Sequence, residues 1–275
     1  MKTILVPTDF SEISKNAVDY AIEMAKVMPA RIMLIHAYHV PVVTVDATII
    51  VPAMYEIKDA GINSLQKMKN ELLSKHGKIV VDYCCVEGFA VDEINNYTKT
   101  NHVDLVVIGM HGAGYLTEKL IGSVTTSLLR ESNSPVLAID QKVKFKAPKK
   151  IVLACDYKQI NKSALESLKT IAMLFDSHIY ILNVAPEKEL VLNTIESAVC
   201  GLSLDHSFEK IDHSFHYTNN ENVVDGINEY VDSQQMDMVV MVPRKYSLLK
   251  SFFYEPNTKK IAFHTHVPVL ALHEQ

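Results

Sequence analysis

An internal repeat constrains the fold of this chain more than any other feature of its sequence. The segment KTILVPTDFSEISKNAV at residues 2–18 returns, 147 positions later, as KKIVLACDYKQINKSAL at residues 149–165. Two further pairs match at an offset of 133: VDLVVIG (103–109) with MDMVVMV (236–242), and SPVLAI (134–139) with VPVLAL (267–272). One fold is therefore used twice, and the difference between the offsets falls in the middle of the repeat.

The lysine-rich segment DQKVKFKAPKK, residues 140–150, separates the two repeats. Its charge and its proline, Pro148, are typical of a linker. We therefore predict two domains, residues 1–142 and 148–275. A chain of 275 residues is long enough for two domains of ordinary size.

Short β-branched runs alternate with helical segments inside each repeat, which predicts an α/β fold. In the first repeat we expect strands at 3–6, 31–37, 80–86, 105–108 and 136–139, and helices at 11–28, 56–75, 91–100 and 123–131. The runs ILV, IMLI and LVVI are apolar throughout, as in strands that are covered on both faces. The predicted fold is two tandem doubly wound parallel five-stranded sheets, whose ligands bind beyond the carboxyl ends of the strands.

Composition excludes several partners. The net charge is −5 and no basic cluster is present, so a nucleic acid is not expected. The first apolar run is broken by Pro7 and Asp9, which makes it too short for a signal peptide. No run approaches the roughly 20 apolar residues of a membrane span. Since the four cysteines lack metal-ligand spacing, we expect thiols in the cytoplasm.

Glycines are concentrated in VVIGMHGAGYLTEKLIGSV, residues 106–124. Gly109 follows a predicted strand, where we expect a sharp turn with positive φ. Gly112 and Gly114 keep the loop open, and Gly122 with Ser123 begins a helix whose N–H groups suit a phosphate. The spacing matches neither the Gly-Lys-Ser/Thr phosphate loop nor the G-x-G-x-x-G motif. The residues alone leave a turn or packing role open for any single glycine.

These motifs resemble those of a universal stress protein of the tandem, two-domain kind, with a HUP or adenine nucleotide α hydrolase-like fold. The resemblance implies that Asp9 binds the ribose hydroxyls of ATP and that Ala37 meets the adenine through its backbone. It further implies roles as pocket floor and phosphate cradle for Pro7, Thr8, Gly109, Met110, Gly112, Gly122, Ser123 and Val124. Whether Mg²⁺ accompanies ATP stays open. Independently of the resemblance, an aspartate at the carboxyl end of a strand is well placed to accept hydrogen bonds from a diol. The alternative role for Asp9 is the N-cap of the helix that follows.

The second repeat has lost the glycines. Gapless alignment places Val242, Lys245, Glu255 and Pro256 at the positions of Gly109, Gly112, Gly122 and Ser123, and Ala154 at that of Pro7. A carboxylate then stands where phosphate would bind, and proline removes an N–H donor. We therefore expect one ATP per chain. Arg244 and Lys245 are interpreted as part of an exposed basic loop. The alternative is that they bind an anion other than a nucleotide phosphate.

Histidines also gather in the second repeat, as His206, His213 and His216 and as His264 with His266. Transition metals bind such residues, but without cysteine ligands or a recognised spacing we assign no metal site. His36 and His39 are interpreted as residues of a strand end. No catalytic residue is assigned, although His111 is a possible acid or base inside the glycine loop.

The predicted function is a nucleotide-dependent stress-response or regulatory module with an unidentified protein partner. One alternative is a slow ATPase or a phosphoryl- or adenylyl-transferring enzyme. Another is a scaffold that binds an apolar ligand or partner through the segment 39–55, which is unusually apolar for a surface connection. The matching last strands SPVLAI and VPVLAL are expected to pair, which would make the chain an intramolecular pseudo-dimer.

Overall fold

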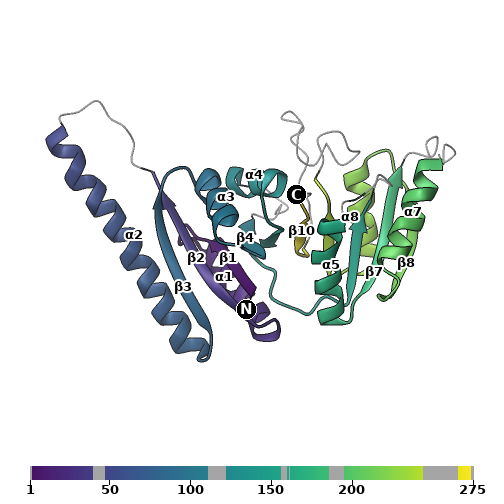
Figure 1. Ribbon diagram of the computed structural model, residues 1–275, viewed down its shortest axis with the longest axis horizontal. Coiled ribbons are helices and arrows are strands. Elements are labelled where there is room, and N and C mark those ends of the chain that lie inside the picture. The colour runs from purple at the N-terminus through teal and green to yellow at the C-terminus, as the bar shows by residue number, and fades with distance from the viewer. Residues whose placement is uncertain are drawn as a thin grey trace.

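The computed structural model describes residues 2–39, 47–110, 122–155, 160, 162–185, 195–243 and 266–273, with only the backbone at 47–54, 162 and 195–198. Its strands form one ten-stranded sheet in the order β3-β2-β1-β4-β5-β10-β9-β6-β7-β8 (Figure 1). The strands are β1 Lys2–Pro7, β2 Ala30–Tyr38, β3 Val80–Glu87, β4 Leu105–Met110, β5 Val136–Asp140, β6 Lys150–Ala154, β7 His178–Ala185, β8 His213–Asn219, β9 Met238–Met241 and β10 Val269–Ala271. Each half contributes five parallel strands.

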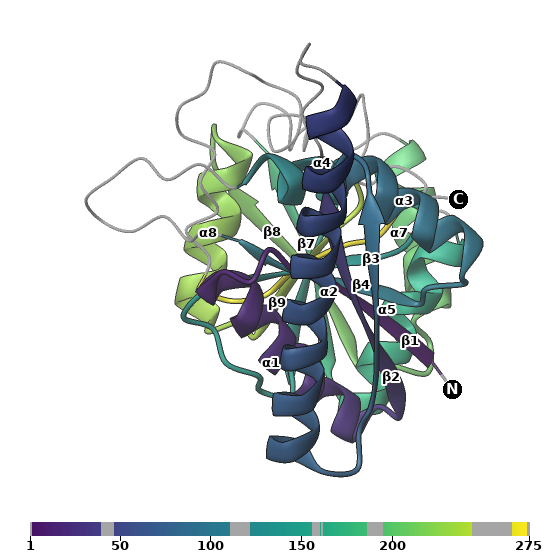
Figure 2. The ribbon, with the colours of Figure 1, turned by 90° about the vertical axis from the view of Figure 1, so that its left-hand side faces the viewer.

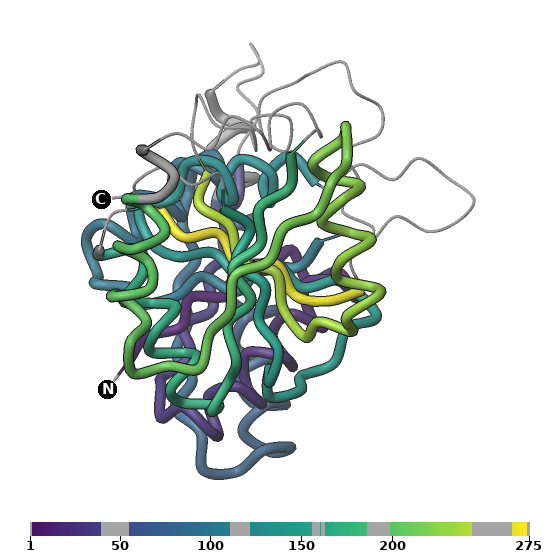
Figure 3. Tube along the Cα trace, turned by 90° about the vertical axis from the view of Figure 1, so that its right-hand side faces the viewer, coloured from purple at the N-terminus to yellow at the C-terminus, as the bar shows by residue number. Residues whose placement is uncertain are grey.

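Helices cover both faces of the sheet. They are α1 Glu12–Val27, α2 Ala47–His76, α3 Ala90–Thr100, α4 Ser123–Glu131, α5 Lys162–Phe175, α7 Ile195–Ser207 and α8 Val223–Gln234. Residues of α1, α2, α5 and α7 pack into one hydrophobic cluster, and residues of α3, α4 and α8 pack into the other. Figure 3 shows α7 and α8 on opposite sides of the strands. This is the predicted doubly wound α/β fold, and none of its described helices is long and apolar enough to cross a membrane.

The two halves meet at an antiparallel joint between β5 and β10. Val269 pairs with Ala138, Leu270 with Leu137 and Ala271 with Val136, and all six residues are buried. The predicted contact between the two last strands is therefore present. The two five-stranded sheets that we expected are continuous, because each apolar edge strand supplies the hydrogen-bonding partner that the other lacks.

The segment 140–150 is packed against the body of the molecule. The Phe145 ring lies 5.2 Å from that of Tyr20 and 6.1 Å from that of Phe175. The Asn16 amide donates to two backbone carbonyls of this segment, at 3.0 and 2.9 Å. The charged residues suggested a plain linker, but alternate positions carry the apolar side chains that bind it to α1 and α5.

Helix α2 is the main departure of the first half from the second. It has 30 residues, whereas its counterpart α7 has 13, so the extra residues of the first repeat lie between β2 and β3 as expected. Figure 2 shows α2 in front of the end of the sheet. The prediction of a loop over 47–55 was wrong, because the helix begins at Ala47. A nucleated helix gains one hydrogen bond for each added residue that has an N–H, which favours this extension despite Pro52. Residues 40–46 lie outside the described part of the chain.

Candidate functional site

The candidate site lies at the carboxyl ends of β1 and β4. The chain runs outward from β1 through β2 to β3 and then returns to place β4 on the other side of β1. Strand order therefore reverses between β1 and β4, and open α/β sheets bind ligands at such a switch point. The structure brings to this edge Pro7, Thr8, Asp9, Ala37, Gly109, Met110, Gly122, Ser123 and Val124. Gly112, Gly114 and His111 lie outside the described residues.

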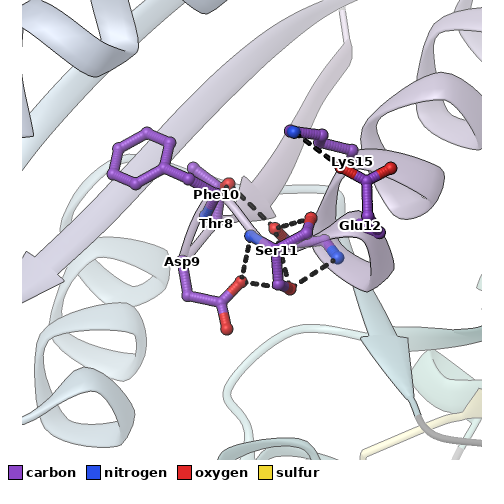
Figure 4. Close-up of polar contacts among 7 residues, drawn as sticks. Thr8, Asp9, Phe10, Ser11, Glu12 and Lys15 are labelled. Atoms are coloured by element: carbon purple, nitrogen blue, oxygen red, sulfur yellow. Dashed lines mark hydrogen bonds and ion pairs between the residues drawn. The ribbon is translucent and has the colours of Figure 1, made fainter.

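Asp9 forms a tight turn between β1 and α1. Its Oδ1 atom accepts hydrogen bonds from the Ser11 N–H at 3.0 Å and the Ser11 hydroxyl at 2.6 Å. Figure 4 shows the other carboxylate oxygen pointing away from these contacts, and the residue is exposed. The N-cap of α1 is Ser11, whose hydroxyl accepts from the Ser14 N–H. Asp9 is therefore not the helix cap, and one of its oxygens faces outward.

The electrostatics of Asp9 favour its charged form. Burial raises the pKa of this carboxyl, but the hydrogen bonds donated to it by the Ser11 hydroxyl, the Ser11 N–H and further donors of the turn outweigh that effect, so the pKa lies below its ordinary value. The group is an acceptor for any hydroxyl that approaches the edge at neutral pH.

The floor of the turn is fixed from within. Thr8 is buried, its hydroxyl accepts from the Phe10 N–H at 3.0 Å, and its N–H donates to the Ile35 carbonyl at 2.9 Å. The His36 Nδ1–H donates to the Thr8 carbonyl at 2.8 Å, which fixes the histidine tautomer. Phe10 has a φ of 64°, a left-handed conformation that non-glycine residues rarely adopt. Thr8 thus fixes the backbone of the turn, with its polar atoms engaged in hydrogen bonds within the protein.

Gly109 has a different role from the predicted one. It lies inside β4, paired with Ile139, and it is not among the described glycines with positive φ. A Cβ atom at Gly109 would lie 2.6 Å from the Ile13 side chain and 2.7 Å from the Ile13 carbonyl oxygen. The predictions of a strand end at Ile108 and of a turn at Gly109 were therefore wrong. The glycine lets the start of α1 approach β4.

Gly122 occupies the N-cap of α4 with ordinary dihedral angles, φ −54° and ψ 144°. An added Cβ there would meet only the Thr125 hydroxyl, at 3.9 Å, among the described residues. No described side chain caps this helix end, and Ser123 is exposed. The Thr125 hydroxyl donates to the Gly109 carbonyl at 2.9 Å, which ties the helix to β4. Among the described residues, the first N–H groups of α4 thus lie beside β4 without a capping side chain.

The second half carries side chains at the matching positions that the structure describes. Val242 and Ala154 are both buried, at the positions of Gly109 and Pro7. Arg244, Lys245, Glu255 and Pro256 lie outside the described residues, so their placement stays a prediction.

His213 and His216 of the second half lie on opposite faces of the sheet. His213 lies 3.1 Å from the Asp205 carboxylate and close to the Phe208 ring. His216, three residues along β8, instead meets Ser214 at 2.8 Å. Within the described residues no three His, Cys, Asp or Glu side chains are grouped to hold a metal. His206 is exposed on α7, and His264 lies outside the described residues.

A hollow of about 490 Å³ opens at the opposite edge of the sheet, between the ends of α3 and α4. Its polar groups already have structural partners: the Asp104 carboxylate accepts from the Thr3 N–H at 2.7 Å, and the Ser134 hydroxyl donates to the Val103 carbonyl at 2.9 Å. The switch point is therefore the better candidate for a ligand site. The supporting roles of His36 and Ser11 escaped sequence reasoning, although Ser11 stands three residues before Ser14 at a helix start, a signal that capping rules could have used.

Comparison with known proteins gives a consistent result. A model of the universal stress protein family matches residues 1–140 and again 148–273. Universal stress protein YxiE of Bacillus subtilis is 30% identical over 145 residues, which cover 50% of this chain and 97% of that protein. Universal stress protein MJ0531 of Methanocaldococcus jannaschii is 30% identical over 151 residues, covering 54% of this chain and 84% of that protein. The crystal structure of a universal stress protein from Archaeoglobus fulgidus covers 99% of this chain and 98% of its own, with a TM-score of 0.73 at 17% identity.

Proposed function

The chain belongs to the universal stress protein family, and on that premise we propose that its first half binds ATP as the ligand of a stress-response or regulatory module. The observation that carries the proposal is the outward carboxylate oxygen of Asp9 on the same edge of the sheet as the start of α4, which no described side chain caps. A ribose diol and a phosphate chain need these two kinds of group, an acceptor and a set of N–H donors.

Each part of the nucleotide has a group to receive it. Asp9 would accept hydrogen bonds from the ribose hydroxyls, and the N–H groups at Gly122, Ser123 and Val124 would donate to the phosphates. The Ala37 backbone, in the last part of β2, would meet the adenine. Mg²⁺, if it accompanies ATP, would bind through phosphate oxygens and water, as this cation commonly does.

The second half would act as a structural companion without a nucleotide. We propose that the β5–β10 joint makes the chain an intramolecular counterpart of a dimer of single-domain relatives. YxiE supports this idea, because nearly its whole length matches only half of this chain. We place the protein in the cytoplasm, since no two of its four cysteines form a disulfide. A protein partner would bind differently to the first half with and without ATP.

Titration calorimetry with ATP tests the proposal on the full chain. We expect one nucleotide per chain, and a parallel titration with GTP measures the preference for adenine. Absence of any heat of binding would remove the proposed function. Two nucleotides per chain would show that the second half also holds a site.

A further inference from the structure

Two aromatic rings stack at the edge of the sheet that carries Asp9. His39 directly follows β2, and Phe89 stands between β3 and α3. Their ring centroids are 4.5 Å apart with an interplanar angle of 24°. His39 is exposed, and Phe89 has 64% of its surface exposed. A large apolar ring is thus presented to solvent next to the candidate ligand site.

Phe89 contributes little to the fold at this position. It is the N-cap residue of α3 and makes no side-chain hydrogen bond to the helix. Helices prefer Ser, Thr, Asp or Asn there, because a side-chain oxygen can accept from the first N–H groups. The start of α3 would therefore gain from Ser, Thr, Asp or Asn in place of this exposed ring.

The second half has such a residue. The register that matches Asp104 with Asp237 places Asn222 at the position of Phe89. Asn222 is the N-cap of α8, and its side chain accepts from the N–H groups of Val224 and Asp225 at 2.9 and 3.3 Å. The half that has lost the glycine motif thus carries a good cap, whereas the half that keeps the motif carries an exposed aromatic ring.

The order of the strands places the ring pair where a base would lie. Along the edge, β4 with the start of α4 comes first, then β1 with Asp9, then β2 with His39 and β3 with Phe89. Neighbouring strands are about 4.8 Å apart. The sheet edge therefore carries, in order, N–H donors for phosphates, a carboxylate acceptor for ribose hydroxyls, and two aromatic rings. The phosphates, ribose and base of a nucleotide follow one another in the same order and over a similar length.

From this placement we infer that Phe89, backed by His39, is a stacking platform for the purine base. The inference rests on the proposed function and adds to it the element that recognises the base. An exposed ring face offers stacking to a planar base, worth about tenfold or more in affinity for each base.

Phe89→Asn, which imports the residue of the second half, separates binding from folding. We expect the affinity for ATP to fall about tenfold, the affinity for inorganic triphosphate to stay unchanged, and the melting temperature to stay level or rise because a cap is restored. Unchanged ATP affinity in this variant, with binding still lost in Gly122→Glu, would overturn the platform and leave the proposed function intact. Failure of the unmodified protein to bind ATP would overturn both.

Phe89→Trp gives a second, direct test. The chain has no tryptophan, so the new indole is its single such fluorophore. We expect saturating ATP to quench its emission and inorganic triphosphate to leave it unchanged. The control is Phe215→Trp, on the distant edge strand β8, which should respond to neither. An unaltered emission of Phe89→Trp on saturation with ATP would overturn the inference.

Discussion

The two halves of the chain hold matching backbone groups by equivalent hydrogen bonds. At some of these positions the side chain that makes the bond differs between the halves. In the first half the Thr3 N–H donates to the Asp104 carboxylate at 2.7 Å, and in the second the Lys150 N–H donates to the Asp237 carboxylate at 2.9 Å. His36 donates to the Thr8 carbonyl at 2.8 Å, and its counterpart Asn183 donates to the Cys155 carbonyl at 2.9 Å. The backbone directly after the first strand, at Thr8 and at Cys155, is therefore held in the same way in both halves.

The halves differ in several residues at the carboxyl edge of the sheet. Gly109 becomes Val242, Pro7 becomes Ala154, and Phe89 becomes Asn222. The frame contacts use a donor and an acceptor, which several residue types can supply. The positions that have changed depend on open space or on one specific group, and at Gly109 the open space is filled by Ile13. The comparison teaches that the α/β fold persists in a half that lacks the glycine motif. Substitutions can test whether ligand binding and folding depend on different residues.

The largest expected effect is that of Gly122→Glu, which places the residue of the second half in the first. We predict a loss of ATP affinity of at least about 100-fold, since a carboxylate would stand against the phosphates at a helix start. Stability should change little, because the Cβ position is open to the described residues. Calorimetry and thermal melting measure the two quantities. Undiminished binding would show that Gly122 is needed only for the backbone turn before α4 and not for the phosphates.

Asp9→Ala should have the next largest effect. We predict that the free energy of ATP binding weakens by about 1.5 to 3 kcal/mol, the range for hydrogen bonds to a charged group. The loss of stability should be small, since Asp9 is exposed and its carboxylate bonds mainly to Ser11 in the same turn. Calorimetry at neutral pH measures the affinity. A collapse in melting temperature with unchanged affinity in the folded fraction would instead assign Asp9 to the fold.

Gly109→Ala should affect the stability of the fold, in contrast to the two substitutions above, which should affect binding. We predict a loss of about 1 to 3 kcal/mol in the free energy of unfolding, because the new methyl group would overlap the side chain and carbonyl of Ile13. Urea unfolding measures this loss. Val242→Ala in the second half is the control for a change at the matching position. Equal stability of Gly109→Ala and the unmodified protein would show that the contact with Ile13 does not require a glycine.

Asn222→Ala should have the smallest effect. We predict a loss of about 1 kcal/mol of stability, because the amide oxygen caps two N–H groups of α8. ATP affinity should not change. Urea unfolding and calorimetry on the same samples check both statements. A fall in ATP affinity would show that the second half takes part in binding, and the proposed division between the halves would then be wrong.

The sequence determined the repeat, the order and approximate bounds of the first-half elements, and the matching last strands. These features are local or periodic: the alternation of apolar and polar residues reports which face of an element is buried. The sequence also placed Asp9 and Gly122 at the carboxyl edge, because strand ends and helix starts can be recognised from short segments.

Only the tertiary structure decided what each of these residues contacts. It showed that Gly109 makes room for Ile13 whereas Gly122 has open space, although both are glycines of one motif. It packed Phe145 between α1 and α5, and it stacked His39 on Phe89. Each of these contacts joins segments that are far apart in sequence. Which partner a side chain meets depends on how whole elements pack, and no local pattern carries that information.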